Sequence, residues 1–89
     1  MEKLNLDEIR KEINEINDDI LKLFVRRMEL SALVHRYKKE NGLPTTDRRR
    51  EEAILQKVAD NTDEEFRQYA LRLFHELIAL SKEYQDSLK

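Results

Sequence analysis

The chain has 89 residues, of which 40% are charged, and its formal net charge at pH 7 is −2. This length suits one small domain, and the near balance of charges argues against a nucleic-acid or membrane-surface protein, which usually carries a basic excess. Cysteine is absent, which excludes disulfides and thiolate metal sites, and His35 and His75 lack the spacing of a metal site. No apolar run is long enough for a membrane span or a signal peptide, so we expect a cytoplasmic protein without metal or cofactor.

The single glycine and the single proline lie together in the segment 41–44. A protein built from strands and tight hairpins needs more turn residues than this, so the composition predicts an all-helical fold. We expect one domain, residues 1–89, with a long helix at about 6–40 and two shorter helices at about 47–59 and 63–87.

The first predicted helix carries an apolar residue at every third or fourth position, the spacing of a stripe packed along its whole length. This apolar stripe consists of Leu6, Ile9, Ile13, Ile16, Ile20, Leu23, Leu30, Val34 and Tyr37. Asn41 and Gly42 follow as a stop signal. At about 1.5 Å per residue the helix is roughly 50 Å long, more than two shorter helices can cover. We therefore predict an intertwined homodimer in which two copies of this helix cross antiparallel; a helical hairpin with a protruding end is the alternative.

Arg27 falls on the apolar stripe. A buried guanidinium needs an anionic partner, and no obvious acidic residue shares the stripe, so the anion is predicted to be a ligand. Lys38 lies eleven residues further on, almost three turns, and projects from nearly the same face. Arg10 lies 17 residues before Arg27 and would reach this region only from the partner chain of an antiparallel dimer.

The second predicted helix begins near Thr46 or Asp47, either of which can cap it. Arg50 and Glu51 lie on or beside its apolar edge, because they precede apolar residues by four positions. This helix therefore adds one cation and one carboxylate to the candidate ligand site.

The third predicted helix opens at Thr62, which we expect to form a capping box with Glu65. Near its other end, Ser81 and Gln85 replace apolar residues on the line of its apolar face. Several cations, one carboxylate, one amide and one hydroxyl suit a small polyanion that carries a hydroxyl group.

The sequence shows no nucleophile–base pair, phosphate loop or cofactor motif. What remains is binding, or a reaction that needs only conformational restraint and fixed charges. Taken singly, most of these residues also fit a solvated surface: Arg10 as an isolated cation, Lys38 at a charged helix end, and Arg50 in the run 48–50.

The order and spacing of these polar residues resemble those of the all-helical chorismate mutases, over nearly the whole chain. The matching positions are Arg10, Arg27-x-Glu29-Leu30, Lys38, Pro44, Asp47-x-x-Arg50-Glu51 and Ser81-x-x-x-Gln85. The resemblance implies a free-standing, single-domain enzyme that rearranges chorismate to prephenate in tyrosine and phenylalanine biosynthesis, without a cofactor. It also implies an intertwined homodimer with two active sites, each completed by an arginine of the other chain.

By this resemblance, Arg10 of the partner subunit, Arg27 and Arg50 would hold the two carboxylates of the substrate, which the planar fork of arginine matches. Lys38 and Gln85 would donate hydrogen bonds to the ether oxygen, where negative charge builds as the C–O bond breaks.

Glu51, with the region of Asp47, would accept from the ring hydroxyl, and Ser81 would support the carboxylate end. Two positions differ from many relatives, namely Lys82 in place of an aliphatic residue and His35 in place of a smaller one. Isochorismate pyruvate lyase has a similar scaffold and is the nearest alternative, although Glu51 favours the mutase. A non-catalytic helical dimerisation module is the alternative from another class.

Overall fold

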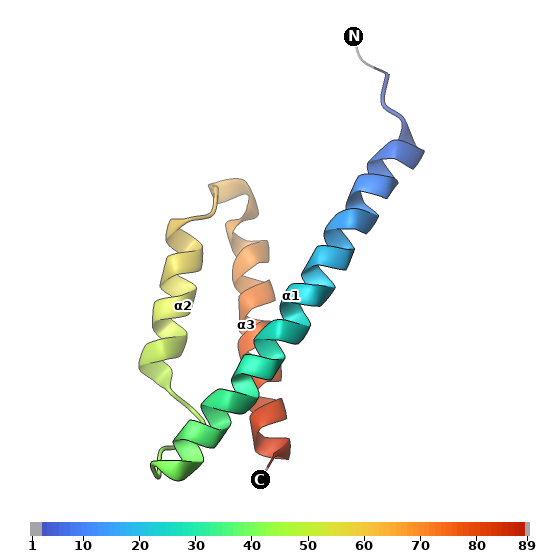
Figure 1. Ribbon diagram of the computed structural model, residues 1–89. Coiled ribbons are helices and arrows are strands. Elements are labelled where there is room, and N and C mark those ends of the chain that lie inside the picture. Colours follow the sequence, from blue (N-terminus) through green and yellow to red (C-terminus); the bar gives the residue numbers. More distant parts are fainter. Residues whose placement is uncertain (1–2, 89) are drawn as a thin grey trace. The chain divides into compact units, whose positions relative to one another are not determined.

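The computed structural model describes residues 3–88, and these contain three helices and no strand. The helices are α1 (Leu6–Glu40), α2 (Arg48–Asp60) and α3 (Glu64–Ser87) (Figure 1). The prediction of an all-helical fold with one long and two shorter helices is confirmed. None of the described helices is both long and apolar enough to span a membrane.

The chain divides into an N-terminal unit that ends at Leu30 and a C-terminal unit that begins at Ser31. The N-terminal unit holds the first part of α1. Asn5 caps this helix, because its Oδ1 accepts from the backbone N–H groups of Asp7 at 3.0 Å and Glu8 at 3.3 Å. The apolar stripe is largely exposed here, with 55% of Ile20 and 70% of Leu23 accessible to solvent.

The end of α1 follows from the single glycine of the chain. Gly42 has a φ of 65°, a left-handed conformation that favours glycine. The backbone N–H of Leu43 bonds the carbonyl of Lys38 at 2.8 Å, and that of Gly42 bonds the carbonyl of Lys39 at 3.4 Å. These two bonds form a Schellman motif, so the predicted stop at Asn41 and Gly42 is confirmed.

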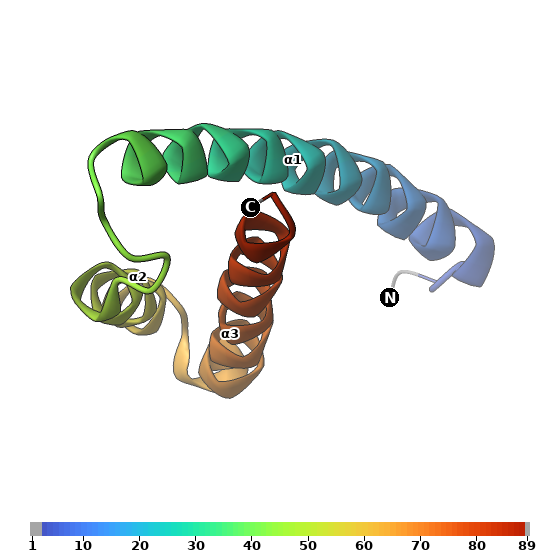
Figure 2. The same ribbon diagram turned by 90° about the horizontal axis from the view of Figure 1, so that it is seen from below.

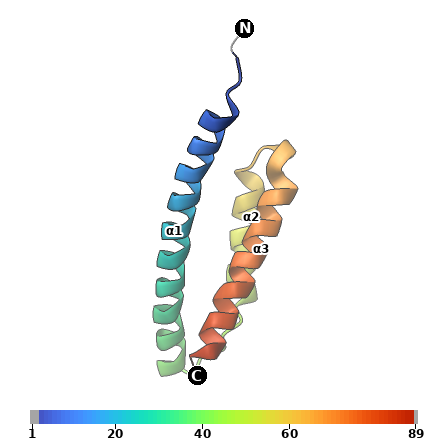
Figure 3. The ribbon, with the colours of Figure 1, turned by 90° about the vertical axis from the view of Figure 1, so that its right-hand side faces the viewer.

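The C-terminal unit contains α2 and α3, which Figures 1 and 3 show side by side and running in opposite directions. Figure 2 shows the loop after α1 leading into the start of α2. Asp47 caps α2 and accepts from the backbone N–H of Arg50 at 3.1 Å, so Asp47 rather than Thr46 is the cap.

The capping box predicted for the start of α3 is wrong. The N-cap residue is Asp63, without a side-chain cap hydrogen bond, and the hydroxyl of Thr62 donates to the carbonyl of Val58 instead. The physical reason is the short connection, since Thr62 also lies next to the last carbonyls of α2, which lack helical partners. Arg67 satisfies two further carbonyls there, those of Ala59 and Thr62, each at 3.0 Å.

Candidate functional site

The buried polar side chains of the described region form one chain of contacts in the C-terminal unit. Ser31, Ser81 and Gln85 are only 6%, 9% and 5% exposed. The Ser31 and Ser81 hydroxyl oxygens lie 2.7 Å apart, and Gln85 Nε2 donates to Ser81 Oγ at 3.2 Å. The other end of the amide, Gln85 Oε1, is buried without a hydrogen-bond partner. The structure thus brings Ser81 and Gln85 together and adds Ser31, which the sequence analysis did not single out.

Glu51 is the carboxylate of the candidate site, and Lys82 is its cationic partner. Lys82 Nζ lies 3.2 Å from Glu51 Oε1 and 3.5 Å from Oε2, so the ion pair links α2 to α3. The two side chains are partly buried, 34% exposed for Lys82 and 24% for Glu51. A carboxylate has about four lone-pair positions, so one ammonium leaves room for a further donor such as a hydroxyl.

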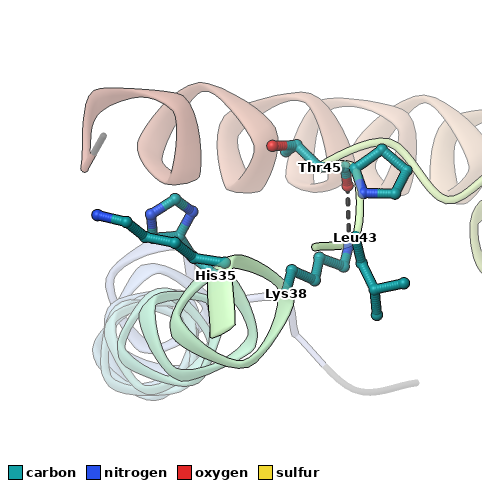
Figure 4. A pocket seen from close by; sticks show the side chains of 6 residues that line it. His35, Lys38, Leu43 and Thr45 are labelled. Atoms are coloured by element: carbon teal, nitrogen blue, oxygen red, sulfur yellow. Dashed lines mark hydrogen bonds between the residues drawn. The ribbon is translucent and has the colours of Figure 1, made fainter. Parts of the chain in front are cut away.

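Lys38 extends from the last turn of α1 to the loop that follows it. Its Nζ donates to the backbone carbonyl of Thr45 at 2.7 Å (Figure 4). A pocket of about 290 Å³ lies at this place. Its lining residues are His35, Lys38, Lys39, Leu43, Pro44 and Thr45. His35 Nε2 is also buried without a hydrogen-bond partner. This loop therefore holds the predicted catalytic ammonium in a defined position.

The remaining predicted residues are less enclosed. Asp47 uses its carboxylate to cap α2, and the side chain of Arg50 is exposed. Arg10 is exposed and Arg27 is half-buried; both lie in the N-terminal unit. The roles of these two arginines at the site remain predictions.

The sequence contains a weak indication that Ser31 has a structural or functional role. Ser31 stands between Leu30 and Val34 of the apolar stripe, and a serine inside a helix is unfavourable unless its hydroxyl has a use. The sequence could not indicate that Lys38 binds the carbonyl of Thr45, because every residue carries a backbone carbonyl.

Comparisons with known proteins show which family this chain belongs to. The family model for chorismate mutase type II matches residues 9–86. A chorismate mutase from Methanocaldococcus jannaschii is 36% identical in an alignment 90 residues long, and the alignment covers 91% of this chain and 88% of that protein. The solved structure of a conserved hypothetical protein from Pyrococcus furiosus has a TM-score of 0.76 and 33% identity, and the match covers 94% of this chain and 99% of that one.

The family match and the named relative together define the class of this protein as an all-helical enzyme. The chain belongs to the chorismate mutase type II family, whose model matches most of its length. It is accordingly an enzyme of the isomerase class.

Proposed function

We propose that this protein rearranges chorismate to prephenate in the biosynthesis of tyrosine and phenylalanine, in the cytoplasm and without a covalent intermediate. The match of residues 9–86 to the chorismate mutase type II family carries the proposal. The tethered Lys38 ammonium supports it, because it is a fixed hydrogen-bond donor of the kind this reaction needs.

The first part of the proposed mechanism is conformational restraint. The substrate is a flexible dianion that must fold into a chair-like conformer before its bonds can rearrange. Arg27, Arg50 and Arg10 of the partner subunit clamp the two carboxylates, since guanidinium groups bind carboxylates in a bidentate, directional way. Holding both ends of the substrate lowers the entropy that must be lost on the way to the transition state.

The second part is electrostatic stabilisation at the ether oxygen. Lys38 and Gln85 donate hydrogen bonds to this oxygen, which gains negative charge as the C–O bond breaks. Lys38 exchanges the neutral carbonyl of Thr45, its acceptor in the unliganded chain at 2.7 Å, for this oxygen. The bond strengthens with the developing charge, so it stabilises the transition state more than the ground state.

The third part is recognition of the ring hydroxyl by Glu51, together with the Asp47 region. The ion pair with Lys82 at 3.2 Å holds the Glu51 carboxylate and leaves lone pairs for the hydroxyl. This contact is the one expected to distinguish chorismate from isochorismate, in which the hydroxyl is placed differently.

A homodimer completes the proposal. The exposed apolar stripe supports it, because Ile13, Ile16 and Ile20 each leave about half of their surface accessible in the single chain. A contiguous apolar face of this kind usually marks a protein–protein contact. We infer that a second, antiparallel copy covers the stripe and supplies Arg10 to the site.

Incubation of the purified protein with chorismate, followed by absorbance and NMR, tests the function. Loss of chorismate with stoichiometric appearance of prephenate is the expected result. Pyruvate released from isochorismate, with chorismate untouched, would instead assign the lyase activity. Inertness toward both compounds would leave a dimerisation module.

A further inference from the structure

The chain of contacts formed by Ser31, Ser81 and Gln85 ends in a group without a partner. Gln85 Nε2 donates to Ser81 Oγ at 3.2 Å, and Oε1 of the same amide is buried and unpaired. A buried acceptor without a hydrogen bond is unfavourable, so its position indicates where a ligand group would bind. Gln85 is only 5% exposed, so this acceptor has little contact with bulk water.

This orientation of the amide is wrong for the proposed reaction. The ether oxygen of chorismate carries no proton, so it can only accept a hydrogen bond, and Gln85 Oε1 is also an acceptor. Rotating the amide by a half turn exchanges its two ends without changing its shape. Nε2 then faces the unpartnered position as a donor, and Oε1 takes its place beside Ser81.

The rotated amide fixes the direction of the other two hydrogen bonds. Oε1 must accept from Ser81, whose hydroxyl has a single proton. The contact of 2.7 Å between Ser31 and Ser81, in which either oxygen can be the donor, must then be donated by Ser31. Each hydroxyl in such a chain strengthens the next hydrogen bond by polarising it.

We propose that Ser31 is a positioning residue for the reaction. Its hydroxyl donates to Ser81, Ser81 donates to Gln85 Oε1, and the amide nitrogen of Gln85 is thereby turned toward the ether oxygen of the substrate. This inference rests on the proposed mutase function and goes beyond it. In this inference the Ser81 hydroxyl donates its hydrogen bond to Gln85. The family resemblance had instead implied that Ser81 supports a carboxylate of the substrate.

A double-mutant cycle with chorismate as substrate tests the inference. Gln85→Ala removes the donor itself and should lower kcat by about 100-fold. Ser31→Ala removes only the group that orients it and should lower kcat roughly fivefold, with an unchanged KM. In the Gln85→Ala background, Ser31→Ala should have no further effect on kcat, because no amide remains to be oriented.

Three controls separate this role from a structural one. Ser87→Ala makes the same chemical change at an exposed serine near the end of α3 and should leave kcat unchanged. Ser31→Thr and Ser31→Val have the same shape, but only threonine keeps the hydroxyl. Threonine should therefore retain a higher kcat than valine by about the same fivefold factor, at matched melting temperatures.

An equal loss of kcat from Ser31→Ala in both backgrounds would overturn the inference, as would equal kcat values for the threonine and valine variants. Absence of turnover by the wild-type protein is a different result. It would overturn the proposed function, and with it the role of Ser31 in that reaction.

Discussion

The two units of this chain differ in what they leave to solvent and what they bury. The N-terminal unit exposes a row of large apolar side chains, including Ile16, Ile20 and Leu23. The buried polar residues of the described region, Ser31, Ser81 and Gln85, all lie in the C-terminal unit, where Ile78 is the one buried apolar residue.

The C-terminal unit also holds half-buried apolar residues, among them Ile54, Phe74 and Leu80, so its buried polar residues stand out on helices that otherwise bury apolar side chains. An exposed apolar face gains free energy only when another surface covers it, whereas buried polar groups cost free energy unless they are hydrogen-bonded. We therefore propose that the N-terminal unit serves association and that the C-terminal unit binds a polar ligand. Substitutions in each unit should affect these two properties separately.

The largest effect on turnover is expected at Lys38 in the C-terminal unit. Lys38→Ala removes the proposed charged donor to the ether oxygen and should lower kcat by about 100-fold to 1,000-fold. The dimer should persist, since the side chain contacts the loop at Thr45 rather than the apolar stripe. Steady-state kinetics with chorismate and light scattering measure the two properties. Lys57→Ala, at an exposed site on α2, is the control. A folded Lys38→Ala variant with a near-wild-type rate would refute the mechanism.

A substitution at Arg27 tests whether the N-terminal unit also contributes to catalysis. Arg27→Leu restores an apolar residue to the stripe, so the melting temperature should stay the same or rise. Turnover should nevertheless fall, with kcat/KM lower by roughly 100-fold, because a carboxylate of the substrate loses its guanidinium. Arg26→Leu, at the neighbouring exposed position, is the matched control. If Arg27→Leu kept full activity, the unit would serve association alone.

A substitution at Ile20 tests whether the apolar stripe forms the contact between two copies of the chain. Ile20→Glu places a carboxylate within the apolar stripe, which a second copy of α1 is proposed to cover. Each copy would also lose about 1.5–3 kcal/mol of apolar burial, so the dimer dissociation constant should rise by at least about tenfold. Sedimentation at several protein concentrations measures this constant. Asn14→Glu adds the same charge on the exposed face away from the stripe and should change it little. A dimer that survived Ile20→Glu unchanged would show that the stripe is not the contact surface.

The features that sequence alone could predict are local ones. The near absence of glycine and proline, with apolar spacing of three and four, predicted three helices. Gly42 predicted the end of the first helix, and Thr46 or Asp47 the start of the second. The capping box failed because two helix ends compete for Thr62, and sequence does not show which one wins. Ser31 was missed because its partner lies 50 residues away. The role of Arg10 depends on a second copy, which the pattern of one chain can suggest but not display.

The smallest effect on kinetics is expected at Lys82, which forms the ion pair with Glu51 between α2 and α3. Ion pairs that are partly exposed, as this one is, contribute about 0–1 kcal/mol, so Lys82→Ala should barely change the melting temperature. The Glu51 carboxylate would lose the ammonium that orients it toward the ring hydroxyl, and KM for chorismate should rise about threefold with kcat retained. Lys82→Arg keeps the charge and should restore most of the affinity. Since a purely structural ion pair would leave KM unchanged, the KM of Lys82→Ala decides whether this ion pair contributes to substrate recognition.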